Sequence, residues 1–236
     1  MEAIGIRTED FQLAYRLIKK FRDLNIPHIQ LDHRKDVPSD INLWFGSNEE
    51  VNVSADYRGV AVDIDNIDLI VNAELNKLFA GPNVDELCFG VDTGPRPGLA
   101  WFADNRLIGS IQLEFVDDVI MEIIRVIDQI HPKKALIRIG NGPKTLSNRI
   151  INSCINQGLN VELVDEKNTS NGSRHDHKSS AESIAEKSGI PIFERTKIIP
   201  TRGEVREIQR ISRLFTEGKI TIPTELAFSV AIGTLS

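Results

Sequence analysis

The sequence has few cysteines and no long apolar run. Its 236 residues include two cysteines, far apart and each in an apolar stretch, so neither a disulfide framework nor a zinc site is expected. No apolar run approaches the roughly 20 residues that cross a bilayer. The sequence opens with an apolar strand and an amphipathic helix rather than a signal peptide. We therefore expect a cytoplasmic protein without a membrane partner.

Positive charge is scarce in the first part of the chain. Residues 1–130 carry 12 Lys+Arg and 23 Asp+Glu, a net charge of −11, whereas residues 131–236 carry 16 and 11, a net charge of +5. The whole chain has a net charge of −6. This asymmetry permits the second part to bind a phosphate backbone, although a solvated surface also explains the charge pattern.

The first 82 residues alternate strands and helices but have no phosphate-binding loop. Neither a Gly-x-Gly-x-x-Gly nor a Walker-type pattern follows the first strand. A short crossover joins the first two strands, which predicts a parallel sheet. We interpret residues 1–82 as a small Rossmann-like βαβ module without assigned chemistry, whose polar residues are loop and capping groups. Strands are expected at residues 3–6, 26–31, 43–45 and 60–62, with helices after Thr8 or Asp10 and over 67–79.

A different order follows in residues 85–236, which we expect to form the second domain. Three strands precede two helix–strand units, and this β-β-β-α-β-α-β order predicts a mixed sheet with helices on its faces. The same order occurs in ribonuclease H-like domains and in the two lobes of actin-like ATPases. The apolar helix over residues 224–235 is expected to be buried. Strands are expected at 86–92, 99–103, 106–115, 135–139 and 161–164, with a further strand-like segment at 190–193, and helices at 117–131, 146–157, 179–188, 204–217 and 224–235.

Asp92 is the first candidate for a chemical role. It ends an apolar strand directly before a glycine-rich turn. Gly94 and Gly98 would let a backbone or a metal-bound phosphate approach closely. Two-metal phosphodiester cleavage needs carboxylates that converge on one point, and strand ends at one sheet edge can hold them rigidly. The structural alternative for Asp92 is a turn-capping carboxylate.

Three motifs give the second domain a family resemblance. Residues 89–100, FGVDTGPRPGLA, resemble the opening strand motif of RuvC/YqgF-like nucleases in the ribonuclease H-like superfamily. Residues 164–170, VDEKNTS, are similar to the D-E-x-x-T-[ST] motif of the YqgF branch, and residues 224–231, TELAFSVA, to the final helix motif. The resemblance implies an endonuclease that uses Mg²⁺ or Mn²⁺ and cuts structured nucleic acid, either branched DNA such as Holliday junctions or precursor RNA.

The resemblance also implies a set of metal ligands. Asp92 would bind metal from the first strand, Glu166 from the end of the last strand and Glu225 from the final helix. The superfamily's last acid is usually Asp, so Glu225 departs from the pattern. Glu225 could instead only stabilise the N-terminus of its helix through the helix dipole. In that case Asp176 in the polar loop is the substitute ligand. Residues 140–142 offer no acid after the fourth strand, as in the YqgF branch.

The nucleic-acid contacts are expected on basic residues of the second domain. Arginines at three- and four-residue spacing line one face of the helix over 204–217, opposite its isoleucines. Other polar groups have open interpretations: His175 to His177 as a solvated loop or metal ligands, and Arg138 as a phosphate contact or an ion pair with Glu166. The expected contact residues are Arg96, Lys144, Lys167, Arg202, Arg206, Arg210 and Arg213.

Two other functions stay open. One is a catalytically inactive ribonuclease H-like module that binds nucleic acid or protein. The other is an actin-like nucleotide-binding ATPase or kinase, although residues 1–82 do not show the three-strand meander of a second lobe. Resolvase-type cleavage would also require a homodimer, since two opposed strands are cut together. Core packing is the expected role of Trp44 and Trp101.

Overall fold

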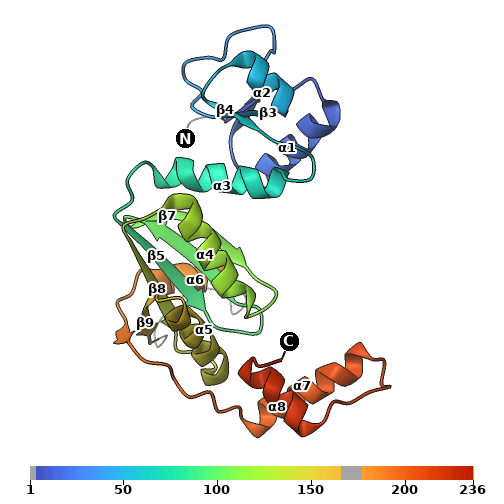
Figure 1. Cartoon of the computed structure of the whole chain (residues 1–236), viewed down its shortest axis with the longest axis vertical. Helices are drawn as coiled ribbons and strands as arrows, with labels where there is room; N and C mark the ends of the chain where they lie inside the picture. Colours follow the sequence, from blue (N-terminus) through green and yellow to red (C-terminus); the bar gives the residue numbers. More distant parts are fainter. Residues whose placement is uncertain (1–3, 166–176, 236) are drawn as a thin grey trace. The chain divides into compact units, whose positions relative to one another are not determined.

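The chain folds into two compact units of mixed α/β structure. The computed structural model describes residues 4–165 and 177–235 (Figure 1). The first unit spans Met1–Leu75 and the second spans Asn76–Ser236. The division falls within helix α3 (Ile67–Ala80), shortly before the turn at Gly81 where the sequence predicts a boundary.

The first unit is built on a four-stranded parallel sheet. Its strand order is β2-β1-β3-β4, and every neighbouring pair is parallel, as the sequence predicts. Asp10 begins helix α1, because its carboxylate accepts hydrogen bonds from the amides of Gln12 and Leu13. Trp44 is fully buried, which confirms the core role expected for it. The elements before α3 are β1 (Ile4–Ile6), α1 (Phe11–Asp23), β2 (His28–Gln30), β3 (Trp44–Gly46), α2 (Asn48–Ser54) and β4 (Gly59–Ala61).

The second unit is built on a six-stranded mixed sheet of order β10-β9-β8-β5-β6-β7. Strands β5, β6 and β7 form an antiparallel meander, whereas β5, β8 and β9 run parallel. This matches the predicted element order, and the strand expected at residues 190–193 is β10, which pairs antiparallel with β9. The strands are β5 (Glu86–Asp92), β6 (Gly98–Ala103), β7 (Arg106–Gln112), β8 (Lys134–Gly140), β9 (Asn160–Val164) and β10 (Ile190–Ile192).

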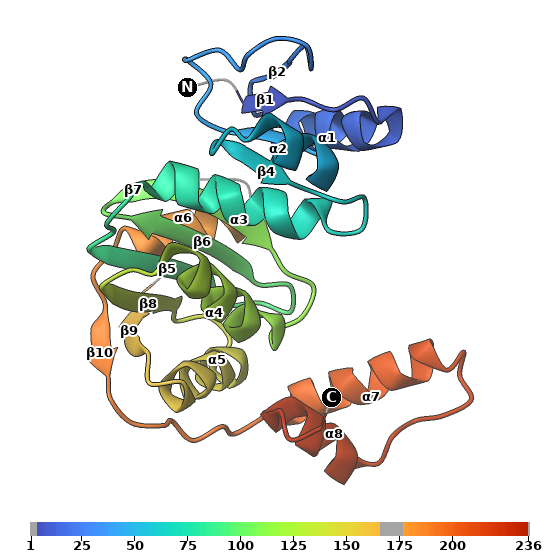
Figure 2. The same cartoon turned by 45° about the horizontal axis from the view of Figure 1, so that its top comes forward.

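Helices cover both faces of this sheet. Helices α4 and α5 lie on one face and α6 on the other (Figure 2). Because side chains alternate along a strand, Leu87, Phe89 and Val91 of β5 face α4 and α5. Helices α7 and α8 follow and pack against each other. The helices are α4 (Asp118–Ile130), α5 (Lys144–Asn156), α6 (His177–Ala185), α7 (Arg202–Phe215) and α8 (Thr224–Ile232).

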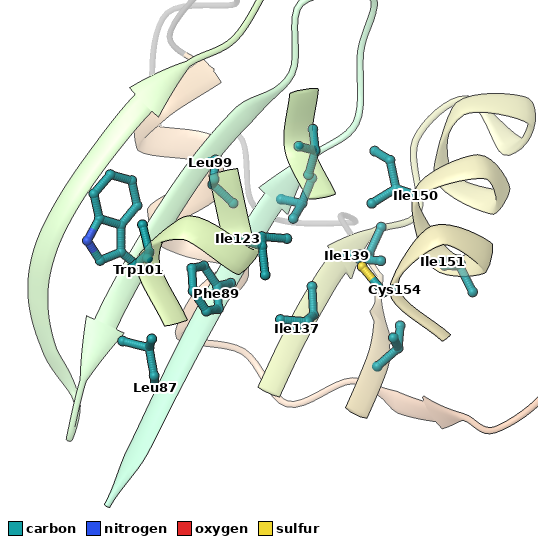
Figure 3. Close-up of a cluster of buried hydrophobic side chains, with 14 of the residues drawn as sticks. Leu87, Phe89, Leu99, Trp101, Ile123, Ile137, Ile139, Ile150, Ile151 and Cys154 are labelled. Atoms are coloured by element: carbon teal, nitrogen blue, oxygen red, sulfur yellow. The ribbon is translucent and has the colours of Figure 1, made fainter. Parts of the chain in front are cut away.

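The main core of the second unit lies between the sheet and helices α4 and α5. Ile123 of α4 and Ile150 of α5 belong to the same buried cluster as Phe89 and Ile137 in the centre of the sheet (Figure 3). Fully burying such a side chain contributes roughly 1.5–3 kcal/mol to folding. Trp101 also belongs to this core, as expected, and its indole N–H donates to the buried amide oxygen of Asn76 at 3.2 Å.

The core on the opposite face of the sheet contains fewer residues, and most of them are small. Cys88, Ala100 and Phe102 of the sheet pack against Ala181 and Ala185 of α6. Small side chains on both surfaces let the helix approach the strands closely. Asp92 belongs to this face, because it alternates with Val91 and pairs with Gly98 across the β5–β6 ladder.

Helix α8 departs from the sequence-based expectation. Its apolar sequence predicts a buried helix, but only Ala227 and Ala231 are buried. Leu226 and Phe228 are exposed. The expectation was wrong because α8 packs on α7 and α5, neither of which surrounds it.

Candidate functional site

Asp92 lies at the carboxyl end of the central strand β5, as the sequence predicts. Its side chain is 15% exposed, so the carboxylate is held by the protein yet reaches solvent. The next residue, Thr93, is buried, and its hydroxyl donates to the carbonyl of Gly140 at the end of the neighbouring strand β8 (3.3 Å). This hydrogen bond ties the turn after Asp92 to the sheet edge and fixes where the carboxylate points.

The described residue that reaches Asp92 is His177, the first residue of α6. Its Nδ1 lies 2.7 Å from Oδ2 of Asp92, although the two residues are 85 positions apart in the sequence. The imidazole is one-third exposed. A hydrogen-bonded carboxylate and imidazole at a strand end are a common arrangement for holding a cation or orienting a catalytic group.

Glycines of the sheet determine how closely α6 approaches. A Cβ atom on Gly98 would lie 1.9 Å from the carbonyl oxygen of His177, and one on Gly90 would lie 2.0 Å from that of Ala181. The sequence suggests that Gly98 makes room either for a backbone segment or for a metal-bound phosphate, and the structure shows a backbone segment there, that of His177. Gly94 is under less constraint, since its Cβ would meet only the His177 ring at 3.8 Å.

Two further polar residues follow the strands beside β5. Asn141 follows β8, and the exposed Asp165 follows β9, so both lie at the same sheet edge as Asp92. Asp165 already takes part in an interaction within the chain. Glu166, Lys167 and Asp176 lie outside the described residues. Within residues 4–165 and 177–235, no three His, Cys, Asp or Glu side chains converge closely enough to hold a metal ion.

Asp92 therefore offers an oxygen donor, while Nδ1 of His177 is engaged with Oδ2 of that carboxylate. Mg²⁺ and Mn²⁺ both accept carboxylate oxygen, so Asp92 suits either ion as part of a larger set of ligands. Glu225 is exposed in the first turn of α8, and α8 packs against α7 and α5. Its role as a ligand stays a prediction, as do those of Glu166 and Asp176.

The predicted basic contacts occupy several surfaces of the second unit. Arg96 is exposed and forms a bidentate ion pair with Glu114, with Nε to Oε2 at 2.9 Å. Lys144 is exposed at the start of α5. Neither position contradicts a phosphate contact, but Arg96 would have to exchange its carboxylate partner for a phosphate.

Helix α7 presents the four predicted arginines on one exposed face. Arg210 pairs with Glu207 at 2.7 Å, and Arg213 donates to the hydroxyl of Thr221 at 2.9 Å. Arg202 and Arg206 form no ion pair with the described residues. These two residues are the ones most readily available to an anionic partner.

Arg138 has a structural role. Its Nε donates to Oε2 of Glu162 on the adjacent strand at 3.0 Å, and its guanidinium also donates to the carbonyl of Ala185 at the end of α6. The same Oε2 accepts the amide of Gly189 at 3.1 Å. Among the described residues the partner is Glu162, whereas the expected partner Glu166 lies outside them, and the Arg138–Glu162 pair fixes the far end of α6 on the sheet.

The two cysteines are buried and free, as predicted. Burial raises the pKa of the Cys88 thiol to about 11 and that of the Cys154 thiol to about 12. Both stay protonated near neutral pH, and a protonated thiol is a poor nucleophile. Neither cysteine is thus a candidate for nucleophilic catalysis.

The first unit contains an open polar groove of about 930 Å³ near the ends of β1 and β2. Arg7 and His33 line it, together with Glu50 of α2. Arg7 donates to the carbonyl of His33 at 2.8 Å, and Glu50 accepts from the amides of Glu9 and Ser47. These contacts hold the loops of the first unit together.

Comparison with known proteins gives one partial match. A family model described as a three helical bundle domain matches residues 201–236, the segment that contains α7 and α8. No curated protein matches the sequence. In the part of the chain that the structure describes, no helix is both long and apolar enough to span a membrane.

Proposed function

We propose that this protein is a divalent-metal-dependent endonuclease that cuts structured nucleic acid, with its site at the end of strand β5. The observation that carries the proposal is the Asp92 carboxylate at the end of a central strand, held 2.7 Å from His177 by a closely packed helix. The substrate class is branched DNA or structured precursor RNA, as the resemblance to RuvC/YqgF-like nucleases implies.

The sheet topology supports a ribonuclease H-like assignment. Read from one edge, the order β7-β6-β5-β8-β9 places an antiparallel meander beside two parallel strands, with Asp92 on the central one. Helix α6 packs on the face of the sheet that carries Asp92. In this topology α6 brings its first residue, His177, to the end of β5.

The residues at this edge have separate tasks in the proposed reaction. Asp92 would bind the metal ion through its carboxylate, and His177 orients that carboxylate by contacting Oδ2. A bound Mg²⁺ or Mn²⁺ supplies an activated water and stabilises the leaving oxygen. Glu166 and Glu225, with Asp176 as the substitute for Glu225, are the proposed further ligands, because Asp92 alone does not complete a metal site.

The basic face of α7 is the proposed contact for the nucleic-acid backbone. Arg202 and Arg206 are exposed and have no carboxylate partner in the described residues, so a phosphate can bind them without displacing an ion pair. Such contacts carry no sequence information, which suits a protein that recognises the structure of its substrate.

The test is a cleavage assay joined to a metal-binding measurement. The purified chain would be incubated with Mn²⁺ or Mg²⁺ and a labelled four-way junction, duplex DNA or structured RNA. We expect Asp92→Asn to reduce cleavage to background and to abolish Mn²⁺ binding in calorimetry. His177→Asn should weaken both by roughly 10- to 100-fold, the usual effect of removing a residue that orients a ligand.

Asp85→Asn is the matched control, because Asp85 precedes the opposite end of the same strand and pairs there with Lys133 at 2.6 Å. It should bind Mn²⁺ and cut as the wild type does. Equal Mn²⁺ binding by the wild type and Asp92→Asn, with no cleavage by either, would overturn the proposal.

The main competing function is a ribonuclease H-like module that binds nucleic acid without cutting it. The observation that favours it is the absence of a three-ligand group among the described residues. Binding to a junction or RNA that needs no metal and survives in Asp92→Asn would support this function. An actin-like ATPase is disfavoured, since the described strands of the first unit are all parallel and form no meander.

A further inference from the structure

Helix α6, which brings His177 to Asp92, is short and packs on strands β5 and β6 through alanines. It has nine residues, and helices shorter than about 12–15 residues are marginal in water without tertiary contacts. Its side chains in the core on this face of the sheet are those of Ala181 and Ala185. Apolar packing of this kind brings the helix close to the sheet, but it is non-directional and does not fix where along the sheet the helix lies.

Directional contacts hold α6 at both of its ends. At the amino end, Nδ1 of His177 lies 2.7 Å from Oδ2 of Asp92. At the carboxyl end, the guanidinium of Arg138 donates to the carbonyl of Ala185, the last residue of the helix. The last carbonyl groups of a helix have no partner within it, and the helix dipole favours a positive charge beside them. Arg138 therefore caps α6 from strand β8.

The carboxylate of Glu162 fixes the position of this guanidinium. Its Oε2 accepts from Nε of Arg138 at 3.0 Å and from the amide of Gly189 at 3.1 Å. Arg138 and Glu162 lie opposite each other in the β8–β9 ladder, and their side chains are 18% and 20% exposed. The N–H groups of a planar guanidinium point in fixed directions, so holding Nε also directs Nη1 at the carbonyl of Ala185. The cap is thus held by the sheet itself.

A further polar contact restrains the middle of α6, but less firmly. The hydroxyl of Ser110 on β7 donates to Oε1 of Glu182 at 2.8 Å. The acceptor is at the tip of a long side chain, which can follow a small shift of the helix without losing the hydrogen bond. The acceptor of the Arg138 cap is a backbone carbonyl, and it moves only when the helix itself moves. Loss of the cap should therefore displace α6 more than loss of the Ser110 contact.

We propose that Arg138 is a positioning residue for the site at the end of β5, because by capping α6 it sets where His177 meets Asp92. His177 and the capped residue are separated by the length of the helix, about 12 Å at 1.5 Å per residue. Arg138 therefore acts through α6 and touches neither the metal ion nor the substrate. The catalytic meaning of this role rests on the proposed function, whereas its structural part concerns the contact between His177 and Asp92 alone.

The first test is nitrogen-15 NMR of the imidazole rings in the full chain, recorded without added metal at one fixed pH. The ring of His177 is assigned by its absence in His177→Asn, and its shifts report the tautomer that a hydrogen bond at Nδ1 selects. Arg138→Gln should shift them to those of a free imidazole. Arg138→Gln with Glu162→Gln leaves no unpaired carboxylate, guards against misfolding and should give the same result. Arg125→Gln is the matched control, since Arg125 forms a similar pair with Glu122 on α4, and it should change nothing.

The second test is a double-mutant cycle on Mn²⁺ binding, measured by calorimetry. Arg138→Gln should weaken binding by up to about 10-fold, the low end of the effect of an orienting residue. In a His177→Asn background it should have little effect, because the residue through which Arg138 acts is gone. Equal effects in both backgrounds, or unchanged His177 shifts in the folded double variant, would overturn the proposal. A wild type that binds no Mn²⁺ but shows the expected NMR change would refute the proposed function and support the positioning of His177 by Arg138.

Discussion

Both units have a carboxylate shortly after or at the end of a central strand, Glu50 in the first turn of α2 after β3 and Asp92 at the end of β5, but they use it differently. In the first unit, Glu50 accepts hydrogen bonds from Glu9, Ser47 and Thr8, groups on two adjoining segments of the same sheet edge. Burial raises the pKa of Glu50, but these hydrogen bonds outweigh it and bring the pKa below its ordinary value. In the second unit, the partner of Asp92 among residues 4–165 and 177–235 is His177, from a helix far along the chain.

This difference separates a structural carboxylate from a candidate functional one. Glu50 has a capping box around it, so its oxygen atoms are already occupied by the protein. Asp92 ends a strand and has one oxygen contacted by an imidazole, which leaves coordination capacity for a ligand. A carboxylate near the end of a strand is thus best judged by how many of its oxygen atoms already accept hydrogen bonds within the fold.

The largest effect should come from replacing, in each unit, a strand glycine that lies directly against the backbone of a neighbouring segment. Gly98→Ala would place a Cβ 1.9 Å from a carbonyl of α6, and Gly46→Ala would place one 2.5 Å from the carbonyl of Arg7. Each should destabilise its unit by roughly 1–3 kcal/mol, measured by urea unfolding. Only Gly98→Ala should also weaken Mn²⁺ binding, because it displaces His177. An equal loss of Mn²⁺ binding in both variants would contradict the assignment of the site to the second unit.

A smaller effect is expected from removing one unpaired arginine. Arg206→Ala should lower the slope of log affinity against log salt by about 1 for duplex or junction binding, the change for one lost phosphate contact. Arg16→Ala, at an exposed position on α1 in the first unit, is the control and should leave the slope unchanged. The same change in both variants would show that nucleic acid contacts the two units alike.

The smallest effect concerns acid stability of the first unit. Hydrogen bonding from the Arg58 guanidinium lowers the pKa of Asp56 from 3.8 to about 2. Because the pKa is lower in the folded state, the stabilisation is complete above pH 3.8 and is lost as the pH falls through about 2. Asp56→Asn should flatten the stability curve in this range.

Trp44 fluorescence in a Trp101→Phe background would report unfolding of the first unit as a function of pH. Asp40→Asn, an exposed aspartate of the same unit, is the control and should leave the curve as it is in the wild type. If the stability of Asp56→Asn depends on pH as steeply as that of the wild type, the prediction is wrong. Arg58 would then stabilise the unit through the carbonyl groups of Pro38 and Ile41, which it also contacts.

Much of the architecture follows from apolar periodicity and turn residues. The three-strand meander, the two crossovers and Asp92 at the end of β5 are all readable in the sequence, because they depend on local patterns. Helix α2 was missed although Ser47 and Glu50 have the spacing of a capping box, a signal that its short and polar sequence obscures. The helix at α7 begins with the same signal, at Thr201 and Glu204.

The partners of Asp92 and Arg138 were not predictable in the same way. His177 follows a polar segment, and its contact with Asp92 depends on how α6 crosses the sheet. Arg138 and Glu162 are adjacent in the β8–β9 register, but that register becomes certain only once the strands are paired. The burial of α8 was overestimated because composition describes what a helix would prefer, not which surfaces exist to cover it.

The close contact between α6 and the glycines of the sheet also limits how this chain can vary. In a library of single substitutions selected for an intact site, positions 90 and 98 should accept almost nothing but glycine, since backbone atoms already fill the space of a methyl group. Position 94, two residues from Asp92, should tolerate alanine. The pattern of tolerated residues would therefore trace the path of α6 across the sheet.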